Sequence, residues 1–311
     1  MRLAPITLFV YNRLWHTQRT IESLQKNYLA NESELFIFSD APKNESIKED
    51  VKKVREYIKT VKEFKSITII ERQYNYGLAN SIIKGATKVL DIYGSIIVME
   101  DDLLSKKGFL KFMNRALEFY KNENKIFSIT GYNFPPSLMK ISKDYREDVY
   151  FCPRCSSWSW ATWSDRWVKV DWELKDIDSF IKDKKQQKLY NYSGDDKSEM
   201  LIAQMKGKID SWAIRWDYAH FKNNAYCVYP VDSFIDNIGF DGSGIHCSSD
   251  KVYSFGENFI DKNFNIKLLS EIKLDRRIMN EFRKIFRRDL MYYLKNIVKK
   301  LIFYEKWKKK D

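Results

Sequence analysis

The sequence predicts an α/β protein with a mostly parallel central sheet flanked by helices. Over the first 130 residues, short apolar runs of strand length alternate with stretches that have helical spacing. This alternation is typical of βαβ units, whose right-handed crossovers place parallel strands side by side. Hydrophobic residues make up 44% of the 311 residues, which is enough for a packed core and excludes the disordered and low-complexity classes.

Each element of this first half is assigned from its pattern of apolar residues. The predicted strands cover residues 6–11, 35–39, 67–71, 95–99 and 126–130, and the predicted helices cover residues 17–24, 47–64, 78–90 and 109–122. In such a sheet the carboxyl ends of the parallel strands share one edge, and ligands bind there. Residues that follow the strands are therefore the first candidates for a functional site.

The second half of the chain has a different amino-acid composition. After about residue 150, tryptophan and tyrosine become frequent, and segment 151–167 is interpreted as an aromatic loop. We expect residues 1–270 to form one domain with halves at about 1–130 and 131–270. A helical appendage over residues 271–311 is expected to follow it.

The appendage carries most of the net charge of +12. Residues 271–311 contain 14 Lys and Arg against 6 Asp and Glu, so the rest of the chain is nearly neutral. A nucleic-acid-binding groove is therefore disfavoured. Apolar residues at three- and four-residue steps over about 274–307 predict a basic amphipathic helix. Such a helix is typical of attachment to an anionic membrane surface, and packing on the body or on a second subunit is the alternative.

The N-terminus lacks the features of a signal peptide, and no stretch reaches 18 apolar residues, so we expect a cytoplasmic protein without a transmembrane helix. The four cysteines are Cys152, Cys155, Cys227 and Cys247. The first two form a C-x-x-C motif, but no second such motif follows. Free thiols are therefore expected, with a zinc site or a redox pair as the alternatives.

The strongest chemical signal is the acidic run Glu100-Asp101-Asp102, which directly follows the apolar strand 95–99. Three adjacent carboxylates repel one another unless a cation or hydrogen-bond donors compensate them. Mg²⁺ and Mn²⁺ prefer oxygen ligands and often share one or two carboxylates with substrate phosphates. The run therefore predicts a metal and diphosphate site, and a solvated loop or an acidic helix start is the alternative. Glycine-rich dinucleotide-binding and P-loop motifs are absent from the sequence.

The sequence resembles the GT-A glycosyltransferases, and most closely the N-acetylglucosaminyltransferase I type, whose metal motif Glu-Asp-Asp-Leu is matched here by residues 100–103. Four further features recur in the family's order: an Arg-bearing turn, a strand ending in Ser-x-Asp or a near variant, an Asp that opens a Trp-containing helix, and a Gly-rich loop with a His. The matching segments are residues 11–13, 38–40, 209–212 and 239–246. The likeness covers about residues 4–250, and the tail has no counterpart.

The resemblance implies a Rossmann-like GT-A catalytic domain with a nucleotide-sugar half and an acceptor half. It implies a metal-dependent, inverting transfer from a UDP-sugar such as UDP-GlcNAc, with Mn²⁺ or Mg²⁺ as cofactor. Unlike for the Golgi relatives, we expect neither an N-terminal membrane anchor nor the cysteine pattern of a lumenal enzyme for this protein. We therefore expect a bacterial-style enzyme of cell-surface glycan assembly, peripheral on the inner face of the membrane. Its acceptor would be a polysaccharide or a lipid-linked glycan.

The resemblance also assigns roles to the donor-side residues. Asp102 would bind the divalent cation, and Glu100 and Asp101 would contact donor ribose or sugar hydroxyls. Arg13 and Asp40 would contact the nucleotide on its base and ribose side. A surface cation at Arg13 and a turn residue at Asp40 are the alternatives.

Three further residues are assigned by the resemblance. Asn80, in the loop and helix start 74–81, would approach the uracil or sugar, His246 would bond the diphosphate, and Asp210 would be the catalytic base. The alternatives are an ordinary helix start around Asn80, a structural His246 and a helix N-cap at Asp210. The fallback bases are Asp217, Asp196 and Glu199.

Aromatic residues of segment 151–167 are candidates for an acceptor floor, specifically Trp158 or Trp160, although core packing is the more frequent role of such rings. Arg154 is a candidate phosphate contact. His16 and His220 are interpreted as structural. Two other functions stay open: a sugar nucleotidyltransferase, whose Gly-rich signature is missing, and a non-catalytic carbohydrate- or lipid-binding module.

Overall fold

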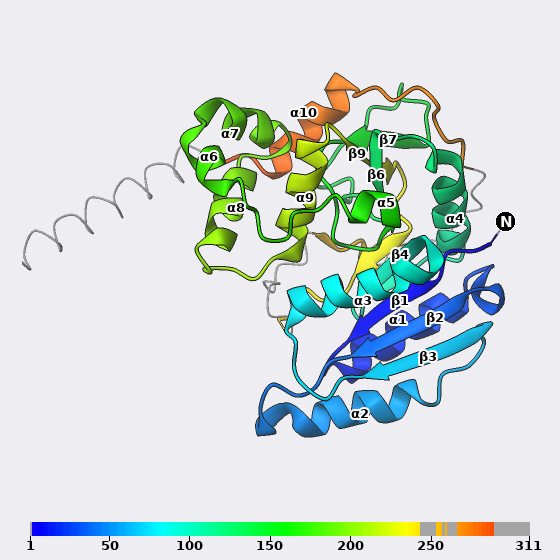
Figure 1. The fold of residues 1–311 in the computed structure, drawn as a ribbon. Helices are drawn as coiled ribbons and strands as arrows, with labels where there is room; N and C mark the ends of the chain where they lie inside the picture. The colour runs from blue at the N-terminus through cyan, green and yellow to red at the C-terminus, as the bar shows by residue number, and fades with distance from the viewer. Residues whose placement is uncertain (1, 243–252, 257–258, 260–265, 289–311) are drawn as a thin grey trace, which may run out of the picture.

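The computed structural model describes residues 2–242, 253–256, 259 and 266–288, and it confirms the α/β class. An eight-stranded sheet has the order β3-β2-β1-β4-β8-β6-β9-β7 (Figure 1). Its strands are β1 (Ile6–Val10), β2 (Glu34–Ser39), β3 (Ser66–Glu71), β4 (Ser95–Glu100), β6 (Ile126–Thr130), β7 (Val149–Cys152), β8 (Trp160–Trp163) and β9 (Tyr226–Pro230). The pairings are parallel except where β7 and β8 meet their neighbours, so the sheet is mostly parallel, as predicted.

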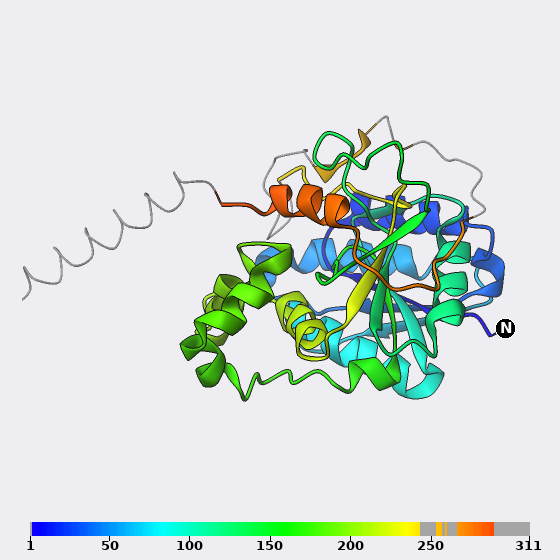
Figure 2. The same ribbon diagram turned by 90° about the horizontal axis from the view of Figure 1, so that it is seen from above.

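The first half follows the sequence pattern closely. All five predicted strands are present, and the four helices are α1 (Leu14–Gln25), α2 (Lys48–Ile58), α3 (Leu78–Tyr93) and α4 (Phe109–Tyr120). Helix α2 ends six residues earlier than predicted, and Glu63 beyond it has a φ of 69°, which a right-handed helix does not accommodate. Helices cover the sheet on both faces, as the view from above shows (Figure 2).

The interpretation of residues 151–167 as a loop is wrong. The segment contains the end of β7, the strand β8 and the short helix α5 (Ser164–Trp167). All four residues of β8 are buried, because helices and neighbouring strands cover both faces of the sheet. A strand buried on both faces has no polar alternation to mark it.

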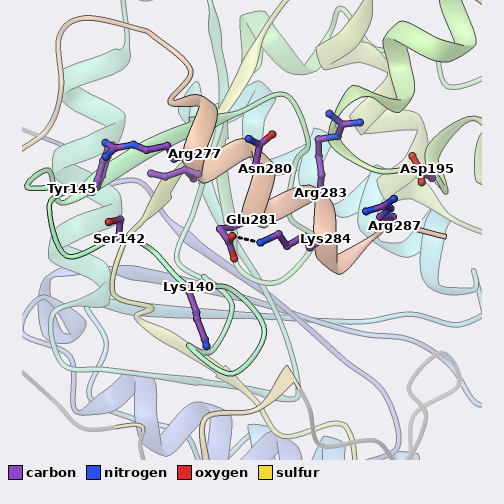
Figure 3. Close-up of a pocket in the computed structure, with 11 residues that line it drawn as sticks. Lys140, Ser142, Tyr145, Asp195, Arg277, Asn280, Glu281, Arg283, Lys284 and Arg287 are labelled. Carbon is purple, nitrogen blue, oxygen red and sulfur yellow. Dashed lines mark hydrogen bonds and ion pairs between the residues drawn. The ribbon is translucent and has the colours of Figure 1, made fainter. Parts of the chain in front are cut away.

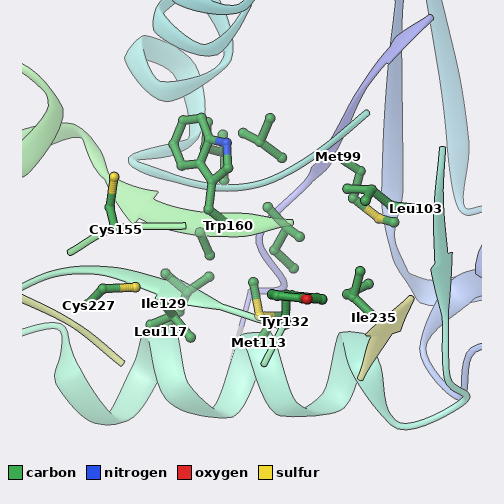
Figure 4. Close-up of a cluster of buried hydrophobic side chains, with 14 of the residues drawn as sticks. Met99, Leu103, Met113, Leu117, Ile129, Tyr132, Cys155, Trp160, Cys227 and Ile235 are labelled. Atoms are coloured by element: carbon green, nitrogen blue, oxygen red, sulfur yellow. The ribbon is translucent and has the colours of Figure 1, made fainter. Parts of the chain in front are cut away.

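The main core lies between the sheet and its helices. Figure 4 shows Met113 and Leu117 of α4 pointing toward Ile129 of β6, with Trp160 of β8 above them. The indole of Trp160 is 1% exposed and stacks on Trp167 at a centroid distance of 5.2 Å. Trp160 is therefore a core residue, and its candidacy for an acceptor floor is wrong.

A second, smaller core lies inside a group of short helices in the second half. These helices are α6 (Ile177–Lys182), α7 (Lys184–Tyr190), α8 (Lys197–Met205) and α9 (Trp212–Lys222). Their common core consists of Leu174, Ile177, Phe180, Tyr190, Leu201, Ile214 and Tyr218. Helices of six or seven residues span less than two turns, so sequence periodicity does not reveal them.

Helix α10 (Arg276–Ile285) packs on the body next to β9 (Figure 1). Its residues Ile278, Met279 and Phe282 are buried, and the Phe282 ring lies 5.5 Å from that of Tyr229. The predicted continuous helix through residue 307 is wrong, because α10 ends at Ile285. Residues 289–311 lie outside the described part. Among the helices that are described, none combines the length and apolarity needed to cross a membrane.

Three of the cysteines are buried free thiols. Cys152 of β7 lies directly opposite Cys227 of β9 in the sheet register, and Cys155 follows on the adjoining turn. Burial raises the pKa of the Cys152 thiol, which keeps it protonated and unreactive. Within the described ranges no cluster of three or more His, Cys, Asp or Glu residues could enclose a metal ion. Cys247 lies outside those ranges.

His220 has the structural role expected from the sequence. Its imidazole is fully buried, with Nδ1 2.9 Å from the Trp216 carbonyl oxygen and Nε2 2.7 Å from the Ser128 hydroxyl. A carbonyl only accepts hydrogen bonds, so Nδ1 carries the proton and Nε2 accepts from Ser128. Burial lowers the pKa of His220 to about 4.

This buried histidine predicts an acid-sensitive fold. Between about pH 6.5 and 4 the unfolded chain binds a proton at His220 that the folded chain does not, so the free energy of unfolding falls as pH falls. At pH 4 the free energy of unfolding is lower by about 3 kcal/mol for this reason. Urea unfolding of the wild type and of His220→Gln at pH 7 and pH 4.5 measures it. The variant is expected to lose less stability over this interval, and an equal loss would exclude His220 as the cause.

Candidate active site

Arg13, Asp40 and the acidic run at residues 100–102 meet at one edge of the sheet, which we call the acidic edge. Arg13 follows β1, Asp40 follows β2, and the acidic run closes β4, so all of them lie at the carboxyl ends of parallel strands. After the acids the chain forms β5 (Leu103–Ser105), which pairs antiparallel with β10 (Ile235–Asn237). This pairing brings residues 237–241 of the second half against the acids of the first.

The centre of this edge is the group of Arg13, Asp101 and Asp102. Both carboxylates are buried, at 5% and 8% exposure, and the Arg13 guanidinium donates to each of them. The bond from Arg13 Nη2 to Asp102 Oδ2 is 2.8 Å long. Asp101 Oδ2 is buried and has no hydrogen-bond partner among the described residues. One acidic oxygen is thus left with unfilled acceptor capacity.

The electrostatics of this edge favour an additional cation. Burial, together with repulsion from Asp102 and Asp101, raises the pKa of Glu100 to about 8. Burial also raises the pKa of Asp101, although Arg13 opposes the shift. Burial alone would lower the pKa of Arg13, but the attraction of both aspartates outweighs it and raises that pKa. Among the described residues, the Arg13 guanidinium therefore compensates the acidic run only in part, and perturbed pKa values of this kind cluster at functional sites.

A glycine permits the second half to approach Asp102. A Cβ atom on Gly239 would collide with the Asp102 carboxylate and would lie 3.2 Å from Asn237 Oδ1. The neighbouring Ile238 amide donates to the Asp102 carbonyl oxygen at 2.9 Å. The loop after β10 is thus held directly on the last acid of the run.

Substitution of Gly239 by alanine is expected to lower the free energy of unfolding by about 1–3 kcal/mol, because the new methyl group overpacks the Asp102 carboxylate. Urea unfolding measures this cost. In an Asp102→Ala background the same substitution should cost clearly less, because the colliding group is gone. An equal cost in both backgrounds would show that the collision is not the cause.

Asp40 organises the loop that precedes α3. Its carboxylate accepts hydrogen bonds from the backbone amides of Tyr76 at 3.0 Å and Gly77 at 3.1 Å. Gly77 has a φ of 71°, a conformation that favours glycine. Asn80 is exposed in the first turn of α3, where its amide donates to the Tyr76 carbonyl oxygen at 3.3 Å. Asp40 and Asn80 therefore both fix the loop at residues 75–77.

Asp210 lies beside the same loop. A Cβ atom on Gly77 would be 3.7 Å from Asp210 Oδ2, and the Asp210 side chain is 60% exposed. It forms an ion pair with Arg215, whose Nη2 lies 4.0 Å from Asp210 Oδ1. The alternative interpretation of Asp210 as a helix cap is wrong, because Ser211 caps α9 by accepting from the Ile214 amide. The Asp210 carboxylate is exposed and takes no part in capping.

The three fallback bases are all engaged elsewhere. Asp217 is buried in an ion pair with Lys197 at 2.8 Å and accepts from the Cys155 amide. Asp196 forms a bidentate pair with Arg154, both bonds being 2.8 Å, and Glu199 pairs with Arg288. The same contacts hold Arg154, whose guanidinium also lies 3.7 Å from the Phe286 ring centre. Of the four candidate bases, Asp210 is the one that is exposed and lies beside the loop at residues 75–77, which Asp40 holds.

Trp158 and His16 lie next to the loop that follows β10. Trp158 is partly buried, and its ring centroid lies 5.5 Å from that of Phe240, next to Gly239. His16, which sequence reasoning treated as structural, is buried in α1 with Nε2 3.1 Å from Asp241 Oδ2. The charges of His16 and Arg13 both act on Asp101, so His16 lies near the acids. No signal in the sequence marked it. His246 lies outside the described residues.

Comparisons with known proteins give a likeness in structure only. No protein-family model and no curated protein sequence matches this chain. The solved structures that are similar to it include the following two. The mannosyltransferase PcManGT of Pyrobaculum calidifontis, in complex with GDP-Man and Mn²⁺, is 13% identical over 53% of this chain, with a TM-score of 0.38. TarS of S. aureus is 13% identical over 74% of this chain, also with a TM-score of 0.38.

This chain spans less than half the length of either structure, covering 46% of the first and 36% of the second.

Proposed function

We propose that this protein is a metal-dependent, inverting glycosyltransferase that takes a sugar from a nucleotide-diphosphate sugar, most simply a UDP-sugar such as UDP-GlcNAc. The acceptor is a glycan or a lipid-linked glycan of cell-surface assembly. One observation carries the proposal. The buried carboxylates of Asp101 and Asp102 lie side by side at the end of a central strand, where Arg13 donates to both. Among the described residues, one oxygen of Asp101 has no hydrogen-bond partner.

The residues present fit Mn²⁺ or Mg²⁺ held jointly with a diphosphate. The described residues offer two close carboxylates rather than a complete protein cage, and these cations often use one or two carboxylates plus substrate phosphates. Asp102 would hold the ion, with Asp101 Oδ2 beside it. When bound, the ion supplies neutralisation of the charge that develops on the leaving diphosphate.

The remaining polar groups of the edge suit the donor. Arg13 supplies a fixed cation beside the acids, and Glu100 and Asp101 present oxygens to ribose or sugar hydroxyls. Asp40 and Asn80 hold the loop at residues 75–77 in place for the nucleotide, as each bonds the backbone there. We assign His246 to the diphosphate on the strength of the family resemblance.

Asp210 is assigned as the catalytic base. An exposed carboxylate can take the proton of the acceptor hydroxyl while that oxygen attacks the anomeric carbon. Attack from the face opposite the diphosphate inverts the anomeric configuration. The half-buried Trp158 beside the Gly239 loop offers an apolar face to the acceptor sugar.

We further propose that the protein acts on the inner, anionic surface of the membrane through its basic C-terminal region. The exposed cations of α10 and the 14 Lys and Arg of residues 271–311 support this part of the proposal. Nucleic acid is not proposed as a partner, because residues 1–270 are nearly neutral.

A thermal-shift panel of nucleoside diphosphates and nucleotide sugars, each with and without Mn²⁺, tests the proposal. A ligand present at 100 times its Kd stabilises the folded state by about 2.7 kcal/mol. We expect such a shift for one nucleotide and only with metal, and the absence of any metal-dependent shift would overturn the proposal. Hydrolysis or transfer of the bound donor separates an enzyme from a non-catalytic binding module.

A further inference from the structure

A second candidate site lies along α10, away from the acidic edge. It is a cavity of about 700 Å³, a size typical of sites for small ligands (Figure 3). One wall is α10 itself. The opposite wall comes from the connection between β6 and β7, including Lys140 and Ser142, and Asp195 closes one end. We call this cavity the α10 groove.

The α10 groove is rich in cations. The basic residues that line it are Lys140, Arg277, Arg283, Lys284 and Arg287. Only two acids, Asp195 and Glu281, line it with them.

Part of this positive charge is not compensated within the protein. Arg277 forms ion pairs with Asp144 and Asp275, and Lys284 pairs with Glu281. Glu281 also interacts with Lys140, through a hydrogen bond from the Lys140 backbone and through charge attraction. In the part of the chain that the structure describes, no carboxylate forms an ion pair with the other two cations, which are Arg283 and Arg287. Uncompensated cations gathered in a concave site attract an anion.

The cations on α10 are held in place by packing. The apolar side of the helix is buried through Ile278, Met279 and Phe282. Beyond the helix, the Asp195 amide donates to the Phe286 carbonyl oxygen at 3.3 Å, and the Arg288 amide donates to Asp195 Oδ2 at 3.2 Å. Arg283 lies in the last turn of α10, and Arg287 lies two residues beyond its end. Because both parts of the chain are fixed to the body, both side chains line the groove from a fixed backbone.

Packed aromatic rings connect the groove with the acidic edge. Phe282 of α10 lies 5.4 Å from Phe134, which lies 5.4 Å from Tyr132. Tyr132 lies 4.6 Å from Trp158, and Trp158 lies 5.5 Å from Phe240, the neighbour of Gly239. The groove therefore belongs to the second half of the chain, the half expected to receive the acceptor.

We propose that the α10 groove binds the phosphate or diphosphate group of the acceptor. This inference rests on the proposed sugar transfer, because it concerns the second substrate of that reaction. Guanidinium groups bind phosphate oxygens with paired hydrogen bonds, which gives both strength and orientation. The group could belong to a lipid headgroup or to a soluble phosphorylated glycan, and the same cations would recognise either.

Binding of two probes to Arg283→Gln and Arg287→Gln tests this inference. The first probe is inorganic pyrophosphate, titrated calorimetrically with a chelator present so that no metal assists binding at the acidic edge. The second is sedimentation with phosphatidylglycerol vesicles, compared with phosphatidylcholine vesicles. Arg276→Gln is the matched control, because Arg276 is exposed on the same helix but does not line the groove.

We expect each groove variant to bind at least one of the probes about tenfold more weakly than the wild type. The control should bind pyrophosphate normally and should lose clearly less vesicle binding than the groove variants. A loss with pyrophosphate indicates a soluble source, and a loss with anionic vesicles alone indicates a lipid. If the wild type binds neither probe, or if both groove variants bind both probes normally, the inference is wrong.

The same proteins distinguish this inference from the proposed function. Metal-dependent nucleotide binding should be unchanged in Arg283→Gln and Arg287→Gln, since neither residue belongs to the acidic edge. A wild type that binds pyrophosphate in the groove but no nucleotide with Mn²⁺ would overturn the proposed function alone. A wild type that binds a nucleotide with Mn²⁺ but neither pyrophosphate nor anionic vesicles would overturn the inference about the groove alone.

Discussion

Asp102→Asn is expected to abolish metal-dependent nucleotide binding and to slow sugar transfer by at least about a thousandfold. The loss corresponds to about 4 kcal/mol of stabilisation of the leaving diphosphate, within the range of metal-ion catalysis. An amide keeps the shape of the carboxylate but removes its charge, so the variant tests charge rather than packing. Thermal shift with Mn²⁺ and nucleotide measures binding, and product formation from the donor measures transfer.

The same substitution is expected to leave the fold intact, with a free energy of unfolding equal to or above that of the wild type. It removes one of three mutually repelling acids, while Arg13 keeps its bond to Asp101. Asp144→Asn is the matched control, because Asp144 is exposed and pairs with Arg277 outside the acidic edge. Normal metal-dependent binding in Asp102→Asn would contradict the assignment, and so would an equal loss in the control.

Asp210→Asn is expected to lower kcat by about a hundred- to ten-thousandfold, the usual contribution of a general base. Nucleotide and metal binding should persist, because Asp210 forms no described bond to the acids or to Arg13. Since its side chain is 60% exposed and caps no helix, the thermal midpoint should not change. Transfer rates under saturating donor, together with a nucleotide thermal shift, separate a catalytic from a binding defect.

Ser211→Ala provides the structural control for Asp210. It removes the side-chain bond to the Ile214 amide and is expected to cost about 1 kcal/mol of stability. Transfer per folded molecule should remain normal in that variant. If Asp210→Asn transferred sugar at the wild-type rate, Asp210 would not be the base.

The sequence predicted the first half well because its strands and helices are regular. The strand at residues 126–130 matches β6 at both ends, and the strand before the acidic run matches β4 to within one residue. Apolar runs of five or six residues between helical stretches leave little choice of element. The position of Arg13, Asp40 and the acids at one sheet edge followed from the same regularity.

The second half could not be read in the same way. β8 is buried on both faces and has the sequence Trp-Ala-Thr-Trp, without polar alternation, and two of the helices around the second core, α6 and α7, have only six and seven residues. The sequence patterns also did not predict contacts between distant segments. The collision that a Cβ on Gly239 would make with Asp102, and the approach of His16 to Asp241, join residues more than 130 positions apart. Such proximities depend on the folded path of the chain, which local patterns do not encode.

The packing of α10 has a consequence for how the chain is made. Phe282 is completely buried against Tyr229 and Phe134, so the core between β6, β9 and this helix lacks one of its rings until residue 282 is synthesised. Synthesis is vectorial and proceeds at about 5–20 residues per second. The first half can pair its parallel strands while the ribosome is still translating the second. The second half completes its core only when almost the whole described chain has left the ribosome, and until then those apolar surfaces remain open to chaperones.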